Sequence, residues 1–430
     1  MRSLRSLLAP WALSGMLMGA LGAPAEAGRV LPPVSFARPH VQGPSSEQVI
    51  YDFGNTRCDG MLPVAPLLPA KDGSFFGTTE AGGCFSGGYG TVYQLVRNGS
   101  SYSDSVLYAF EGYSGNSGSI PEAGVVSDSS GNLYGTTYAG GGSTFSGTAY
   151  ELIPGKPSYS EKVLWAFQNN APGCAWPMST PAWGKNGHLY VTTSIGGSSC
   201  SAGGVLDVST GQVVHEFGCG SDGATPMAGV VVDKHGNMFG TTQQGGTSGL
   251  GTVFEISQSG GESVIYSFRG GADGAYPEAS ITIGPGGKLY GTTTFGGTGK
   301  CQNAEAKKPA GCGTVFQLAP HKHGYTEKVL YSFQGGNDGN EPVAGITRNA
   351  SGVLYGTTYL GGSANAGTVY ELVPSLGIYS ETVLHTFTGR PDGANPAASL
   401  VLLNNVLYGT TYRGGTGTRK GYGTVFTVTP

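Results

Sequence analysis

Short runs of aromatic and β-branched residues recur along the chain at a regular interval. One motif, Tyr-Gly-Thr-Thr, starts at Tyr134, with copies or near-copies starting at Phe76, Tyr190, Phe239, Tyr290, Tyr355 and Tyr408. A second, of the form Gly-Thr-Val-Tyr, starts at Gly90, Gly147, Gly203, Gly251, Gly313, Gly367 and Gly423. A third ends in Phe and occupies 49–53, 106–110, 163–167, 213–217, 264–268, 329–333 and 383–387. Such residues favour strands, and no stretch shows a sustained helical period.

Each repeat also holds a run of small residues, such as 228–232, between a proline-containing loop and a tight turn. We name the four predicted strands a (small residues), b (Tyr-Gly-Thr-Thr), c (Gly-Thr-Val-Tyr) and d (the run ending in Phe). Four short strands in roughly 50 to 60 residues are typical of a propeller blade. Seven such units predict an all-β fold, a seven-bladed β-propeller with four antiparallel strands per blade.

The two ends of the chain are out of phase with the repeat. The first predicted strand, 49–53, is a lone strand d, and the chain ends after a strand c at Val428. We therefore expect the N-terminal strand to complete the last blade, because ring closure removes an exposed sheet edge. An open solenoid would leave 49–53 unpaired.

The sevenfold repeat indicates which residues build the fold. Tyr-Gly-Thr-Thr occurs in nearly every unit, so we interpret it as structural: the aromatic residue fills the space between blades, and the glycine lets the neighbouring blade approach. Functional residues are expected where the repeat fails. The two clearest departures are Trp176, which could offer a sugar a flat apolar surface or simply pack over the blade, and the long loop 298–312.

The N-terminal region predicts export. Residues 1–27 have the positive start, apolar centre and small-x-small end of a signal peptide, and 28–47 have the composition of a flexible linker before the propeller at 48–430. We expect a secreted or periplasmic monomer without a membrane span once the signal is removed. The formal net charge of -4 and the lack of a basic run argue against nucleic acid as a partner.

Seven cysteines in an exported chain favour disulfides. Their places in the repeat predict the pairs Cys58–Cys84, Cys174–Cys200 and Cys301–Cys312. Cys219 is then left over.

Five blades carry an aspartate four residues before the loop proline: Asp59, Asp222, Asp273, Asp338 and Asp392. These aspartates could bind a cation or another ligand at the central opening. The alternative, which we favour, is a local turn in which each carboxylate accepts backbone N–H bonds. One carboxylate per loop is too few for calcium unless loops converge, so we expect no metal and no cofactor.

The units from Asn132 to Leu152 resemble the tandem repeat of bacterial GloVer proteins, also called choice-of-anchor repeat proteins, over about residues 48–430. The resemblance implies export but no established activity. Many members carry a C-terminal anchor, whereas this chain stops at Pro430 directly after strand c, which implies a product without that anchor.

Catalytic patterns are sparse. There is no Gly-x-Ser-x-Gly motif, and His321 and His323 offer only two ligands to a metal. We therefore expect a binding or interaction module whose partner is a glycan or another envelope protein. The alternative is an enzyme acting on a carbohydrate or lactone at the channel mouth. Converging acidic or histidine side chains there would favour the enzyme, and an apolar mouth would favour the module.

Overall fold

The computed structural model describes residues 47–430 except 57, 85–86, 100, 113–116, 143–144, 157, 169–174, 198–200, 302–308 and 417–420. These described residues lie in one compact unit, 44–430. The expected signal peptide, 1–27, and all of the expected linker except Glu47 lie outside them.

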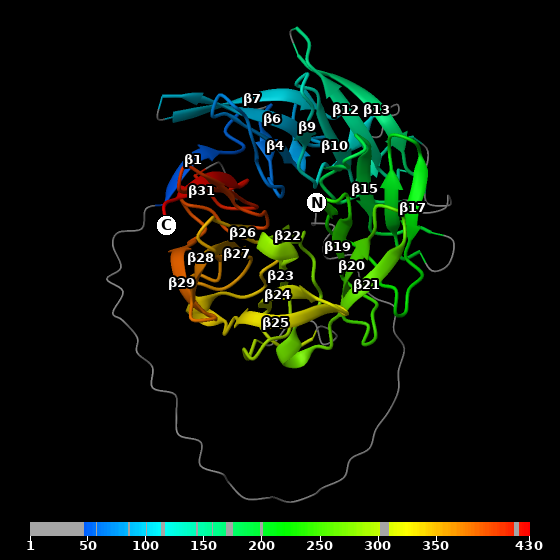
Figure 1. Cartoon of the computed structure of the whole chain (residues 1–430). Coiled ribbons are helices and arrows are strands. Elements are labelled where there is room, and N and C mark those ends of the chain that lie inside the picture. The colour runs from blue at the N-terminus through cyan, green and yellow to red at the C-terminus, as the bar shows by residue number, and fades with distance from the viewer. Residues whose placement is uncertain are drawn as a thin grey trace, which may run out of the picture. The chain divides into compact units, whose positions relative to one another are not determined.

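The described residues form seven four-stranded antiparallel sheets, arranged as the blades of a propeller (Figure 1). This confirms the predicted fold class. The a strands lie towards the centre and the d strands at the periphery (Figure 1). The a strands are β3 (Leu68–Pro69), β9 (Val126–Ser127), β14 (Ala182–Trp183), β18 (Val231–Val232), β22 (Thr282–Ile283), β26 (Thr347–Arg348) and β30 (Val401–Leu403).

The three other strands of each blade carry the repeated motifs. The b strands are β4 (Phe75–Thr79), β10 (Leu133–Thr137), β15 (Leu189–Thr193), β19 (Met238–Thr242), β23 (Leu289–Thr293), β27 (Leu354–Thr358) and β31 (Val406–Thr411). The c strands are β6 (Thr91–Asn98), β12 (Thr148–Ile153), β16 (Gly204–Asp207), β20 (Thr252–Ile256), β24 (Thr314–His321), β28 (Thr368–Ser375) and β32 (Thr424–Val428). The d strands are β7 (Ser101–Ala109), β13 (Ser160–Ala166), β17 (Gln212–Glu216), β21 (Glu262–Ser267), β25 (Gly324–Ser332), β29 (Ile378–Thr386) and β1 (Gln48–Asp52).

Only short elements lie outside the blades. Two-residue strands pair in the loops of blades 1 and 2: β2 (Gly60–Met61) with β5 (Ala81–Gly82), and β8 (Gly118–Ser119) with β11 (Ala139–Gly140). Three single-turn 3₁₀ helices are η2 (Gly271–Asp273), η3 (Pro285–Gly287) and η4 (Gly336–Asp338). No α-helix occurs among the described residues.

The ring closes as predicted, through blade 7. Strand β1 pairs antiparallel with β32, with Gln48 opposite Thr427 and Asp52 opposite Thr424. Figure 1 shows the N-terminal strand β1 beside the C-terminal blade. A second contact crosses the same closure, because the Thr410 hydroxyl donates a 3.3 Å hydrogen bond to the carbonyl of Ala65 in blade 1.

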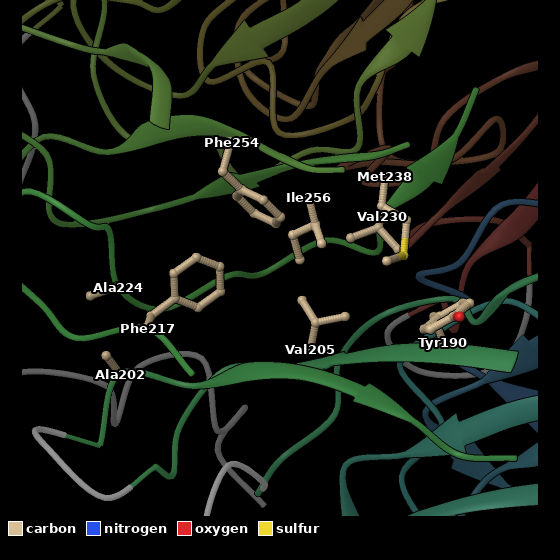
Figure 2. Close-up of a cluster of buried hydrophobic side chains, with 9 residues drawn as sticks. All are labelled: Tyr190, Ala202, Val205, Phe217, Ala224, Val230, Met238, Phe254 and Ile256. Carbon is tan, nitrogen blue, oxygen red and sulfur yellow. The ribbon is translucent and has the colours of Figure 1, made fainter. Parts of the chain in front are cut away.

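The hydrophobic core lies between neighbouring blades. Figure 2 shows one cluster, in which Tyr190 and Phe217 of blade 3 pack with Met238 and Phe254 of blade 4. The Phe217 and Phe254 rings meet edge to face at 5.0 Å. Equivalent pairs join a d-strand end to the next c strand at five other interfaces, such as Phe333 with Tyr370. The aromatic residue of the Tyr-Gly-Thr-Thr motif also fills space between blades, as predicted, because Tyr190, Phe239, Tyr290 and Tyr355 each lie in a buried cluster with residues of the next blade.

Both threonines of Tyr-Gly-Thr-Thr make buried hydrogen bonds. In six blades the first donates to a carbonyl of the next blade's inner segment, as Thr241 does to Ala279 at 2.9 Å, whereas the Thr357 hydroxyl of blade 6 is buried without a partner. The second pairs with the threonine of strand c in its own blade, as Thr242 does with Thr252 at 2.7 Å. One threonine therefore links blades while the other holds two strands of a blade together.

The glycine of Tyr-Gly-Thr-Thr has a different role from the one expected. A Cβ on Gly240 would lie 2.4 Å from the Phe254 ring, which belongs to strand c of the same blade. The glycine that admits the neighbouring blade is instead the one before strand c. A Cβ on Gly251 would lie 2.5 Å from Pro277 in the next blade's loop.

Two compensated exchanges depart from the repeat, one within blade 3 and one between blades 2 and 3. Val191 replaces the motif glycine and lies opposite Leu206, which replaces the bulky aromatic residue. In strand d of blade 2, Trp165 replaces the usual Tyr or His, and Gly211, in the turn before strand d of blade 3, lies under it, where a Cβ would be 2.7 Å from the indole. Both departures conserve packed volume, which explains them without a ligand.

Candidate functional site

The loops before strand a and the loops between strands b and c meet on one face, here called the loop face. On it, the residue before the loop proline has a positive φ in all seven blades: Leu62, Ile120, Trp176, Thr225, Tyr276, Glu341 and Asn395, with φ from 55° to 63°. The residue types at these seven positions differ, so no sequence pattern predicts this shared conformation.

Each residue of this ring is fixed by two backbone hydrogen bonds. The N–H of Trp176 donates to the carbonyl of Ser146 in the preceding blade at 2.9 Å, and its carbonyl accepts from the Ser194 N–H at 3.2 Å. The other six positions repeat both bonds. The backbone is therefore held by contacts that do not involve the side chain.

Trp176 lies beside Tyr138, which follows strand b of the preceding blade. The ring centroids are 5.5 Å apart and the planes are tilted by 35°. Both side chains are partly exposed. Burial and the negative charge of Glu122 raise the pKa of Tyr138 to about 12, so a carboxylate lies close to this aromatic pair. Tyr138 of blade 2 and Trp176 of blade 3 therefore form one aromatic surface that spans both blades.

The residues after the loop prolines start the inner segments of the blades. Five of them are apolar: Val64, Met178, Met227, Val343 and Ala397. The other two, Glu122 and Glu278, stand in blades 2 and 5, and Glu278 accepts a 2.7 Å hydrogen bond from Gln243. No histidine occupies these seven positions.

The five loop aspartates bind their own loops, as the turn interpretation predicted. Asp59 accepts the N–H groups of Gly54 and Asn55 at 2.7 and 3.1 Å. The others accept an N–H four residues upstream in the same way: Asp222, Asp273, Asp338 and Asp392. They contact d-strand side chains at the periphery. They therefore do not gather around the central opening.

Each of these aspartates belongs to a cluster between two outer strands. In blade 5 the Tyr331 hydroxyl donates to Asp338 at 2.8 Å, and Glu381 of blade 6 faces the same carboxylate. Burial and Asp338 raise the pKa of Glu381 to about 8. In the same way, burial and a loop aspartate raise the pKa of Asp104 and of Glu327 to about 7. The interfaces between blades thus hold closely spaced carboxyl groups.

These clusters predict that the propeller loses stability as the pH rises. A carboxyl group with a raised folded-state pKa keeps its proton in the folded protein where the unfolded chain has lost it, so stability is highest at acidic pH and falls as pH rises through the folded pKa. Between about pH 5.5 and about pH 8.5 we expect the melting temperature to fall, on the order of 5 °C. Thermal unfolding monitored by circular dichroism measures this.

A matched variant tests whether Glu381 contributes to this pH dependence of stability. Replacing Glu381→Gln removes one titrating group and keeps its shape, so the stability profile should become flatter and the protein more stable near pH 8. A melting temperature that is constant or rises over this interval would contradict the interpretation.

Two interfaces carry histidine where the others carry tyrosine or tryptophan. His385 Nε2 lies 3.0 Å from Asp392 Oδ2. Burial acts to raise the pKa of Asp392, but the hydrogen bonds from His385 and Thr388 outweigh burial and lower this pKa. His215 Nε2 lies 3.4 Å from Asp222 Oδ1, with Glu262 of the next blade beside them. Burial and Asp222 raise the pKa of Glu262 to about 7.

Sequence reasoning missed these clusters because their members come from three separate segments. A signal was present: an acidic residue stands two positions before the first valine of strand d in six repeats, namely Glu47, Asp104, Glu161, Glu262, Glu327 and Glu381.

The structure contains the predicted disulfides Cys58–Cys84 and Cys301–Cys312. Cys174 and Cys200 lie outside the described residues. The expectation that Cys219 is left over is wrong, because Cys219 is disulfide-bonded. Its partner is not among the described residues. In the loop 298–312, the segment 302–308 also lies outside them.

A groove of about 530 Å³ lies on the opposite face, between blades 3 and 4. His188 and Asp207 line it, with His188 Nδ1 2.7 Å from Asp207 Oδ2. The remaining lining side chains include Lys185, Gln212 and Gln258 but no cysteine and no second acidic residue.

A search of curated proteins gave no match. Among solved structures, a fungal alcohol oxidase in complex with copper is 14% identical, with 89% of this chain and 77% of the oxidase covered and a TM-score of 0.49. A gluconolactonase from Xanthomonas campestris is 11% identical, with coverage of 67% and 83% and a TM-score of 0.36.

A third solved structure is PorZ, a bacterial surface component of the type-IX secretion system of Porphyromonas gingivalis. It is 13% identical, with 85% of this chain and 48% of PorZ covered and a TM-score of 0.43. All three similarities are too low to bear on function. Within the described residues, no helix has the length and apolar character that crossing a membrane requires.

The repeat itself matches a known family. The sequence profile of the Gloeobacter/Verrucomicrobia repeat matches residues 41–205 and 303–430, which is more than half of the chain. The matched residues include the Tyr-Gly-Thr-Thr strands of blades 1, 2, 3, 6 and 7. The chain therefore belongs to the Gloeobacter/Verrucomicrobia repeat family.

Proposed function

We propose that the protein is an exported glycan-binding module and that its loop face holds the ligand. The observation that carries this proposal is the partly exposed pair Tyr138 and Trp176, presented by adjacent blades on a rigid backbone. Aromatic faces stack on the apolar face of a sugar ring, and nearby carboxylates such as Glu122 accept hydrogen bonds from its hydroxyl groups.

A binding role is favoured over catalysis by the residues that start the inner segments. Five of these seven are apolar, and the two glutamates stand three blades apart. Hydrolysis of a glycosidic bond by paired carboxyl groups requires them within about 10 Å of each other. An apolar rim with few polar groups suits recognition of a ligand better than bond cleavage.

Export is supported by the disulfides and by the expected signal peptide. Cys58–Cys84 and Cys301–Cys312 each close a loop on the loop face, and disulfides persist in oxidising compartments. The proposed location is therefore the periplasm or the outside of the cell. There the module would meet glycans of the cell envelope.

A glycan array with the purified protein tests this function, followed by affinity measurements on the bound glycans. The repeat provides matched variants: Trp176→Thr copies Thr225, and Trp176→Tyr copies Tyr276, at a position with the same backbone conformation. We expect Trp176→Thr to weaken binding by about tenfold or more and Trp176→Tyr to retain most of it.

Trp183→Phe is the control, because Trp183 packs edge-on against Tyr134 at 5.0 Å on strand a, away from the pair. Its affinity should match that of the unaltered protein. The proposal fails if no glycan binds, if Trp176→Thr binds equally well, or if the bound glycan is turned over.

A further inference from the structure

The interface between blades 3 and 4 holds a histidine and two carboxylates at a spacing that the other described interfaces lack. His215 comes from strand d of blade 3, Asp222 from the following loop and Glu262 from strand d of blade 4. One side-chain ligand atom from each lies within 4.8 Å of the other two. Among the described residues, no other group of three His, Cys, Asp or Glu side chains meets this spacing.

The three side chains are positioned by different contacts. Asp222 Oδ2 accepts the backbone N–H of Gly218, which leaves Oδ1 directed at His215 Nε2, 3.4 Å away. The His215 ring packs edge to face on Phe217, with centroids 4.8 Å apart. Each side chain is partly buried between the two outer strands.

Two atoms of this group are buried without a hydrogen-bond partner: His215 Nε2 and Glu262 Oε1. The equivalent Glu327 Oε1 and Glu381 Oε1 are in the same state, so His215 Nε2 is the atom that distinguishes this interface. A buried polar atom without a partner is costly, so such an atom calls for a ligand. In the equivalent place of blades 4 and 5, the tyrosine hydroxyls of Tyr266 and Tyr331 donate to the loop aspartate. Histidine replaces that hydroxyl with a ring nitrogen that can bind a metal.

We propose that His215, Asp222 and Glu262 bind a divalent transition metal ion of the Zn²⁺ class. One imidazole nitrogen and two carboxylate oxygens form a three-residue ligand set that zinc accepts, with water in the fourth position. Zinc binds such ligand atoms at about 2.0 to 2.2 Å, so each of the three ligand atoms would move toward the ion by roughly 1 Å or less on binding. The ion joins two blades at the periphery of the loop face and balances two adjacent carboxylates.

The interface between blades 6 and 7 supplies an internal control. His385 occupies the position of His215, but its Nε2–H donates a 3.0 Å hydrogen bond to Asp392, and its side chain is 9% exposed against 19% for His215. This second histidine is therefore already satisfied by the protein. We expect no metal there.

The test is metal binding by the full mature protein after removal of metals with a chelator. All variants carry His321→Ala and His323→Ala, because those exposed histidines could bind metal weakly. Titration with Zn²⁺ by calorimetry and with Co²⁺ by visible absorption should give one site per chain. Saturating Zn²⁺ should raise the melting temperature by a few degrees.

The variant His215→Tyr introduces the tyrosine that the equivalent interfaces carry, as at Tyr266 and Tyr331, so it should fold normally in the presence of chelator. We expect it to weaken Zn²⁺ binding by at least a hundredfold and to abolish the Zn²⁺-dependent rise in melting temperature. His385→Tyr should bind Zn²⁺ like the parent. The proposal is overturned if the parent binds no Zn²⁺ or Co²⁺, or if His215→Tyr binds as tightly as the parent.

Discussion

Deleting residues 48–53 is expected to lower the melting temperature by more than about 10 °C or to leave the protein insoluble. These residues form strand β1, the outer strand of blade 7, and Phe53 just after it. Phe53 is fully buried between Tyr51 and Tyr93, with ring centroids 4.9 and 5.1 Å away. Removing a buried phenylalanine side chain alone costs about 3–5 kcal/mol.

The deletion also opens the ring. It exposes the edge of β32 and removes the bond from the Phe53 N–H to the Gly423 carbonyl. A folded domain is stable by only about 5–15 kcal/mol, so these losses are large against the total. Thermal unfolding of purified protein measures the effect if the deletion variant folds.

A circular permutant keeps the test decisive if the deletion variant does not fold. Residues 47–53 are moved from the N-terminus to follow Pro430 through a short turn, which makes β1 and β32 a hairpin like the other c–d pairs. We expect the permutant to regain most of the stability. If the permutant were no more stable than the deletion, or if the deletion had no effect, closure by β1 would not be what stabilises the ring.

The exchange of Gly240 for valine is expected to destabilise the propeller by about 1–3 kcal/mol, because the new side chain overlaps the Phe254 ring. Phe254→Leu alone leaves a cavity and costs about 1–2 kcal/mol. Together the two changes copy Val191 and Leu206 of blade 3, where the same two strands face each other. The double variant should therefore be more stable than the sum of the single effects predicts.

A double-mutant cycle under chemical denaturation measures this coupling, which we expect to be about 1–2 kcal/mol. Val191→Gly with Leu206→Phe is the reciprocal experiment in blade 3 and should show the same sign. Strictly additive effects in both blades would show that the two exchanges are independent rather than compensatory.

Much of the architecture could be predicted from the sequence because it depends on local periodicity. Strand type follows from aromatic and β-branched runs, and the phase of the first and last strands fixes the closure through β1. The contact partner of a glycine does not follow from the same pattern. Gly240 and Gly251 both stand at glycine positions of the repeat, yet one faces an aromatic ring in its own blade and the other a proline of the next.

The candidate site was harder to predict because contact partners in different blades do not follow from the local repeat pattern. Trp176 stood out as a departure from the repeat, but its partner Tyr138 lies in the preceding blade at a position whose residue type varies. His215, Asp222 and Glu262 come together only because two outer strands are adjacent in the ring. Cys219 was misjudged because its pairing was inferred from the placement of cysteines in blade 1.

The ring of positive-φ residues before the loop prolines has a consequence for how such proteins diversify. Its backbone is held by main-chain bonds to the preceding blade and to its own, and the seven side chains already differ in size and polarity. Substitutions at these positions can therefore alter the surface while the framework keeps its shape. The loop face resembles the paratope of an antibody in this respect, because variable side chains stand on a constant scaffold and new specificities could be selected there without redesigning the fold.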